Sequence, residues 1–151
     1  MKTLPKGITG FNCDGPFLEW STIRKPIIAS IFAAGEKVER EIPGNVGRNY
    51  HRVLTTGPTV LVNYCFKVLA CSNTKDEHCL ENSFVDWGAL QSAIAYYPEW
   101  ELLSSSFLTE PVTAELTKEL GKHELSEMRH WGEKKIGNVI FNYRDKQNRH
   151  R

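Results

Sequence analysis

The stretch NYHRVLTTGPTVLVNYCFKVLA, residues 49–70, decides the fold that this sequence predicts. Its two parts, NYHRVLTT at 49–56 and TVLVNYCFKVLA at 59–70, are rich in β-branched and aromatic residues, which favour strands. Gly57 and Pro58 lie between them and are typical of a turn. We therefore expect an antiparallel hairpin over 49–70. The expected face of its second strand is Val60, Val62, Tyr64, Phe66 and Val68.

A helical pattern precedes this hairpin. From Thr22 to Glu36 the apolar residues recur at helical spacing, with Thr22 as the cap, Pro26 in the first turn and Gly35 at the end. After the hairpin, Phe84 and Val85 predict a short extended piece. WELLS at 100–104 predicts a short strand or turn.

Further helices are expected in the second half of the chain. One covers about 87–97, capped by Asp86 and ended by Pro98, and another covers 111–121. Residues 123–130 are expected to continue as a further helix or turn. In HWGEKKIGNVIFNYRD, 130–145, the spacing of the apolar residues favours a helix, although a strand over 136–143 stays open. The sequence thus predicts an α+β fold, in which a small antiparallel sheet packs with three to five helices.

The length of 151 residues fits a single domain, 1–151, with a sizeable core. Residues 146–151 are basic and are expected to form a frayed tail. No run of about 18 apolar residues predicts a membrane-spanning helix. The four cysteines, Cys13, Cys65, Cys71 and Cys79, are interpreted as reduced thiols. A cytoplasmic protein is the location that we expect.

The charge of the chain is unevenly distributed, although its net value is only +1. From Asp76 to Thr117 there are eight acidic residues and no lysine or arginine. Aromatic residues are interleaved with the acids, so this segment suits a basic partner, which its carboxylates would pair with and its aromatic rings would anchor. The predicted partner-binding residues are Asp76, Glu77, Glu81, Asp86, Trp87, Tyr96, Tyr97, Glu99, Trp100, Glu101 and Glu110. An ordinary acidic face is the simpler interpretation.

The octapeptide HELSEMRH, 123–130, offers an alternative function. On a helix His123, Glu127 and His130 share one face, and two imidazoles with a carboxylate suit a transition metal. A metal-dependent enzyme is therefore one alternative, and a solvated helix face is the plain one. No catalytic residue and no cofactor are predicted, because SSS at 104–106 lacks a G-x-S-x-G elbow. The basic tail YRDKQNRHR, 143–151, is the only feature that favours nucleic acid.

The two ends of the chain carry short signatures. The N-terminal MKTLPKGITGF matches LP-x-G-x-T-G-F, and the C-terminal part matches W-x5-G-x-V-I-F-N-x2-D from Trp131 to Asp145. Together they resemble a family of small, uncharacterised bacterial proteins. Two positions depart from the family pattern, because Asn138 replaces an acidic residue and Arg144 replaces a tryptophan.

Proteins of this kind resemble immunity proteins encoded beside polymorphic or contact-dependent inhibition toxins. The resemblance implies a protein that binds a cognate toxin and blocks its active site by occlusion, without chemistry of its own. A nuclease toxin, with its basic cleft, would match the acidic segment best. A general protein-interaction module with another partner is the remaining alternative.

Overall fold

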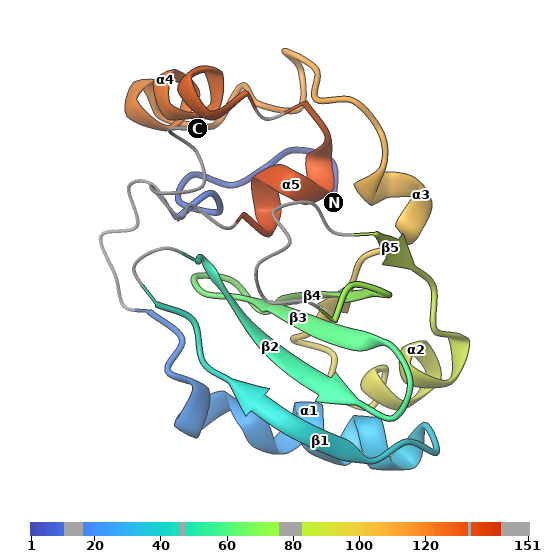
Figure 1. Ribbon diagram of the computed structural model, residues 1–151. Coiled ribbons are helices and arrows are strands. Elements are labelled where there is room, and N and C mark those ends of the chain that lie inside the picture. The colour runs from blue at the N-terminus through green and yellow to red at the C-terminus, as the bar shows by residue number, and fades with distance from the viewer. Residues whose placement is uncertain (11–16, 46–47, 76–82, 133, 143–151) are drawn as a thin grey trace.

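The computed structural model describes residues 1–10, 17–45, 48–75, 83–132 and 134–142 (Figure 1). Within these ranges the chain forms five helices and one six-stranded sheet. This architecture confirms the predicted α+β class, with its small, mainly antiparallel sheet and three to five helices. The expected tail, 146–151, lies outside the described residues.

The sheet is a meander of four strands with two short additions. Strands β1 (Val38–Ile42), β2 (Tyr50–Thr55), β3 (Thr59–Asn63) and β4 (Val68–Ser72) each pair antiparallel with the next. Then β5 (Phe84–Val85) pairs antiparallel and β6 (Glu101–Leu102) parallel with β4. The predicted hairpin is confirmed by β2 and β3, and the short strands at 84–85 and 100–104 also form.

The expectation of one long strand over 59–70 is wrong. The Asn63 side-chain oxygen accepts hydrogen bonds from the backbone nitrogens of Cys65, at 2.9 Å, and Phe66, at 3.0 Å. An asparagine that bonds the backbone ahead of it in this way produces a turn. The chain therefore reverses after Asn63, and β3 and β4 form a second hairpin.

Helices α1 (Trp20–Ala33) and α2 (Gly88–Ile94) cover one face of the sheet, which is the lower face in Figure 1. Ile27 and Ile31 are fully buried there, among residues of β3 and β4. Helix α1 begins at Trp20, two residues earlier than predicted, so Pro26 lies beyond its first turn. It ends before Gly35, as expected, because Gly35 adopts a φ of +90° that favours glycine.

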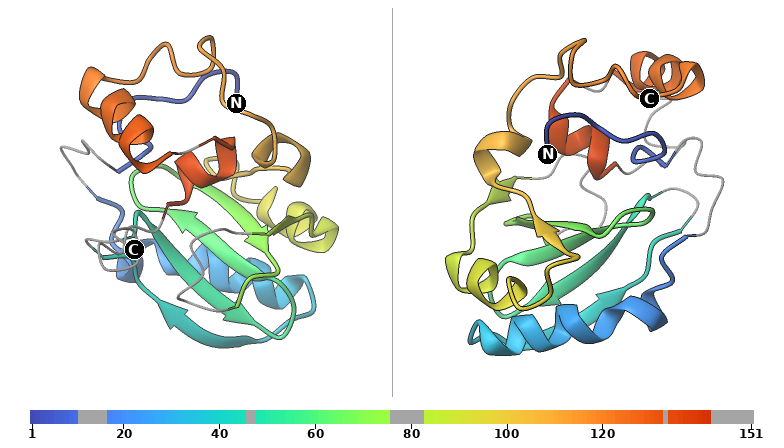
Figure 2. Two further views of the ribbon diagram at one scale, coloured as in Figure 1. Left: turned by 45° about the horizontal axis from the view of Figure 1, so that its top comes forward. Right: turned by 180° about the vertical axis from the view of Figure 1, so that it is seen from behind.

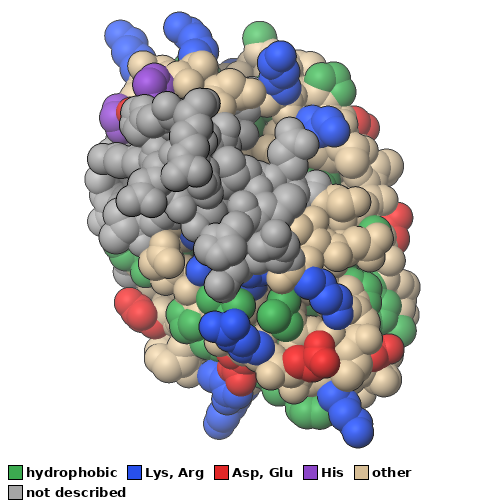
Figure 3. Space-filling view, viewed as in Figure 1, with side chains coloured by type: hydrophobic (Ala, Val, Ile, Leu, Met, Phe, Trp, Pro, Cys, Tyr) green, Lys and Arg blue, Asp and Glu red, His purple; other side chains and the backbone are tan. Residues whose placement is uncertain are grey.

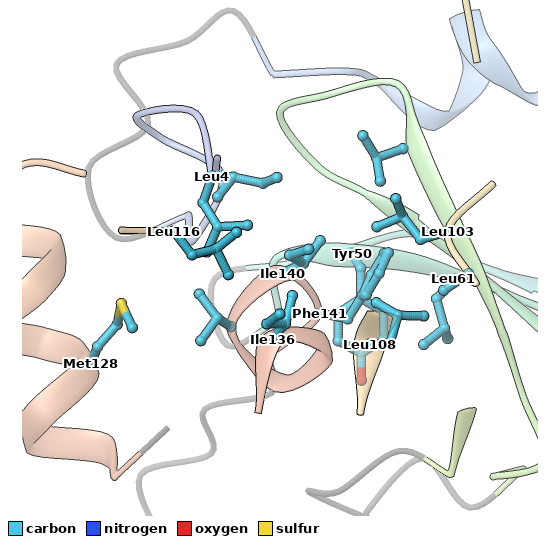
Figure 4. Packing of buried hydrophobic residues seen from close by; sticks show 14 of the residues in the cluster. Leu4, Tyr50, Leu61, Leu103, Leu108, Leu116, Met128, Ile136, Ile140 and Phe141 are labelled. Carbon is cyan, nitrogen blue, oxygen red and sulfur yellow. The ribbon is translucent and has the colours of Figure 1, made fainter. Parts of the chain in front are cut away.

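The other face of the sheet is covered by α3 (Ser105–Leu108), α4 (Lys122–Trp131), α5 (Ile136–Ile140) and the first residues of the chain (Figures 1 and 2). Helix α5 confirms the helical interpretation of the C-terminal stretch. Figure 4 shows Ile136, Ile140 and Phe141 packed between this N-terminal segment and the sheet. Phe141 is fully buried.

The helix expected over 111–121 is wrong. The Val112 nitrogen donates to the Lys134 carbonyl at 2.9 Å, and the Ile136 nitrogen donates to the Glu110 carbonyl at 3.0 Å. These bonds hold residues 110–112 extended against 134–136, and turns rather than a helix follow as far as residue 119. Pairing with a segment over twenty residues away therefore replaces local helical bonding.

Candidate functional site

The described part of the acidic segment runs along one side of the molecule. Strand β5, helix α2, strand β6 and helix α3 follow one another there, on the right in Figure 1 and on the left in the right-hand panel of Figure 2. In Figure 3, which shows the face seen in Figure 1, several acidic side chains lie along this right-hand edge. We call the exposed residues Asp86, Tyr96, Glu99, Glu101 and Glu110 the acidic surface.

Three of the predicted residues, Asp76, Glu77 and Glu81, lie outside the described residues. Within the acidic surface, Glu99 and Glu110 form no ion pair with any described cation. Glu101 lies 3.2 Å from the amino group of Met1. Asp86, Glu99 and Glu110 are therefore exposed acids without an ion-pair partner among the described residues.

The aromatic residues of the segment divide between surface and core. Tyr96 is 86% exposed, in the turn that follows α2, whereas Trp87 and Tyr97 are half-buried against the core below the sheet. Trp100 is only 6% exposed, and the Lys67 amino group lies 5.9 Å from its ring centroid. The prediction of Trp100 as an exposed anchor is therefore wrong, because its ring belongs to the core.

Asp86 is held by the first turn of α3. Its carboxylate accepts hydrogen bonds from the Ser105 nitrogen at 2.8 Å and the Ser105 hydroxyl at 2.9 Å. These two bonds lower the pKa of the Asp86 carboxyl below its usual range, because they stabilise the charged form. The expectation that Asp86 caps the helix after it is wrong, since Trp87 occupies that cap position and makes no side-chain cap.

A pocket of about 200 Å³ opens beside Asp86, between α2 and β6. Its lining combines a carboxylate, an indole ring and aliphatic side chains, which together suit a cationic side chain with a long apolar stem. The residues that line it include Val85, Asp86, Trp87, Gln91, Leu102 and Ser104.

The alternative metal site is not brought together. His123 and His130 are exposed on α4, and Glu127 instead accepts a hydrogen bond from the Trp131 indole nitrogen at 3.1 Å. The His130 ring packs edge-on against Trp131, with the centroids 5.4 Å apart. In the described part of the chain, no three histidine, cysteine or acidic residues gather as metal ligands.

Three buried asparagines, whose role no sequence pattern revealed, join both terminal signatures to the sheet. The side-chain nitrogens of Asn49 and Asn63 each donate to the carbonyls of both Ile8 and Ile140, at 2.8–3.0 Å. The Asn142 amide nitrogen donates to the Thr9 carbonyl at 2.8 Å, and its backbone nitrogen donates to the Asn49 side-chain oxygen at 2.7 Å. We call Asn49, Asn63 and Asn142 the asparagine cluster.

A buried carboxylate makes a second connection. Glu124 is fully buried in the first turn of α4 and accepts hydrogen bonds from the nitrogens of Gly7, at 3.0 Å, and Gly121, at 3.2 Å. It also accepts one from the Thr9 hydroxyl. The sequence contained a signal for this residue, because a glutamate at the third position of a helix commonly bonds back to the cap.

Several described residues of the two terminal signatures have structural roles. Gly10 has a φ of +77°, and a Cβ there would lie 2.6 Å from the Asn49 Cβ. A Cβ on Gly137 would lie 2.2 Å from a ring carbon of Phe84. Together with the bonds of Thr9 and Asn142, these contacts indicate that the signatures specify the scaffold rather than a binding site.

His51, on strand β2, is buried below the sheet. Its Nδ1 accepts a hydrogen bond from the Gly44 nitrogen at 2.8 Å, so the other ring nitrogen carries the proton and donates to the Leu18 carbonyl at 2.7 Å. Burial lowers the pKa of His51 below its ordinary value of 6.5.

The cysteines differ from one another. Cys65 is disulfide-bonded, so the expectation of reduced thiols is wrong for this residue. Cys71 is a free thiol, and its burial raises its pKa to about 12, which makes it unreactive.

Among the described residues, no helix has the length and apolar content needed to cross a bilayer.

Comparisons with protein-family models, with curated proteins and with solved structures found no match to this chain. The resemblance at its two ends therefore stays a prediction.

Proposed function

We propose that this protein is an immunity protein, which binds a cognate bacterial toxin through the acidic surface and blocks its active site by occlusion. The observation that carries the proposal is the highly exposed Tyr96, which lies three residues before the exposed and unpaired Glu99 in a segment that has no lysine or arginine. An exposed aromatic ring surrounded by charge of one sign is typical of an anchor in a protein interface.

The charge of this surface favours a basic partner, and a nuclease with a cationic cleft is the toxin class that we propose. Opposite charges on two partners accelerate their encounter, and this acceleration decreases as salt screens the field. The pocket beside Asp86 would accept a lysine or arginine of the partner. The Asp86 carboxylate is ionised at neutral pH and rigidly held, so it would lose little freedom on binding.

The disulfide at Cys65 bears on where the protein acts. Disulfides persist mainly in oxidising compartments and are rare in the reducing cytosol. The cytoplasmic location predicted from the sequence stays a prediction, and this bond counts against it.

The experiment is a binding measurement with the purified protein and the toxin encoded beside its gene, at low and moderate salt. The triple variant Tyr96→Ala, Glu99→Lys, Glu110→Lys removes the exposed ring and reverses two charges without altering the Asp86–Ser105 bonds. We expect it to bind at least tenfold more slowly, with a smaller salt dependence. Glu39→Lys is the matched control, because Glu39 is exposed on β1, outside the acidic segment.

Two outcomes would overturn the proposal. If no basic toxin bound the protein, the function would be wrong. If the toxin bound the triple variant as rapidly as the unmodified protein, the acidic surface would not be the interface.

A further inference from the structure

A second cavity, of about 360 Å³, lies between α4 and the segment 112–117. Helix α4, which lines this cavity, lies above the sheet in Figure 1, whereas α2, which lines the pocket beside Asp86, lies below it. The residues that line it include Val112, Ala114, Leu125, Met128, Arg129 and Lys134.

The cavity lies between two segments that a backbone hydrogen bond joins at one end. The Val112 nitrogen donates to the Lys134 carbonyl at 2.9 Å, which holds the segment 112–117 beside the end of α4. Gly132 then terminates this helix with a φ of +70° and offers no side chain to fill the space, since a Cβ there would meet nothing within 4 Å. Ala114, in the segment 112–117 on the other side of the cavity from Gly132, is small and exposed.

The lining has two chemical parts. Met128 is buried, and Val112 and Leu125 are half-buried against the main core, so they provide an apolar floor. Arg129 and Lys134 are exposed and form no ion pair with a described residue. Lys118, which lies outside the lining, is by contrast paired with Glu115 at 2.7 Å.

We propose that this cavity binds a small organic anion with an apolar body, such as a medium-chain carboxylate. The apolar floor would bury the body, and Arg129 and Lys134 would bind the anionic group. The cavity volume lies within the range of about 300–1,000 Å³ that is usual for small-molecule sites. This binding is independent of the acidic surface and goes beyond the proposed function.

The test is a titration of the isotope-labelled full chain with octanoate, followed by amide chemical shifts. We expect saturable shifts in residues 112–117 and 125–132, a much weaker response to octanol, which lacks the charge, and none to acetate, which lacks the chain. Saturable octanoate shifts located elsewhere, or no shifts at all, would overturn the proposal. So would octanol shifts at equal concentration, because they would show that charge plays no part.

Two variants at exposed positions test the two parts of the lining. The double variant Arg129→Gln, Lys134→Gln removes both cations and is expected to weaken octanoate binding about tenfold, since each exposed pair contributes modestly. Ala114→Trp places a large ring at the cavity mouth and is expected to abolish the shifts. The control is Lys25→Gln, Arg40→Gln, which removes two exposed cations elsewhere. Equal binding by all three proteins would refute the assignment.

Discussion

The asparagine cluster leads to a quantitative prediction about how the stability losses of two substitutions combine. The carbonyls of Ile8 and Ile140 each accept from both Asn49 and Asn63, so either asparagine alone can still satisfy them. Removing one asparagine therefore leaves both carbonyls paired, whereas removing both leaves two buried acceptors without side-chain partners. We expect the double variant Asn49→Ala, Asn63→Ala to lose more stability than the sum of the single variants.

The magnitudes follow from the bonds that each change removes. Asn49→Ala leaves the buried Asn142 nitrogen without its acceptor, and we expect a cost of about 3 kcal/mol. Asn63→Ala releases the nitrogens of Cys65 and Phe66, which lie in a partly exposed turn, and we expect about 2 kcal/mol. In the double variant the two orphaned carbonyls add a coupling of about 1–2 kcal/mol.

The assay is urea unfolding of the four proteins in the cycle, with the slope of each transition checked before free energies are compared. Asn73→Ala is the control, because Asn73 is exposed and the change is expected to stay within about 0.5 kcal/mol. Additive losses, within about 0.5 kcal/mol, would refute the shared-acceptor reasoning.

Three further predictions concern single residues. Gly137→Ala is expected to cost about 1–3 kcal/mol in urea unfolding, since its Cβ would overlap the Phe84 ring, whereas Gly88→Ala, where the Cβ meets nothing, should be neutral or slightly stabilising. Because burial lowers the pKa of His51, its contribution to stability is present above pH 6.5 and is lost as the pH falls below it. His51→Gln should therefore flatten the dependence of unfolding free energy on pH between about 6.5 and 5, and an unchanged slope would count against this account. Glu124→Ala should cost about 3 kcal/mol and accelerate hydrogen exchange at the Gly7 amide, which would stay protected if Glu124 were not its acceptor.

The sequence predicted those elements whose signals are local. The hairpin of β2 and β3, helix α1 and helix α5 follow from periodicity and from turn residues within each stretch. The break after Asn63 was missed because β-branched and aromatic residues resume directly after this asparagine, at Tyr64, and continue to Val68. Only the bonds from the Asn63 side chain to the backbone show that the chain reverses there.

The candidate site was predicted less well, because exposure depends on tertiary packing. Tyr96 and Trp100 lie four positions apart in the same acidic segment, yet one is 86% exposed and the other 6%. Nothing in their local pattern distinguishes them. The asparagine cluster was missed for the same reason, since the bond from Asn142 to Thr9 joins residues 133 positions apart.

That long connection has a consequence for how the chain is made. While the ribosome is still synthesising the protein, the four-stranded meander can form soon after β4 has emerged, but residues 1–10 must wait for α5, which emerges after all the other described helices and strands. Until then the apolar side chains above the sheet stay open to chaperones and proteases. A nascent chain that stalls before Asn142 should therefore be degraded rather than accumulate as a partly folded fragment.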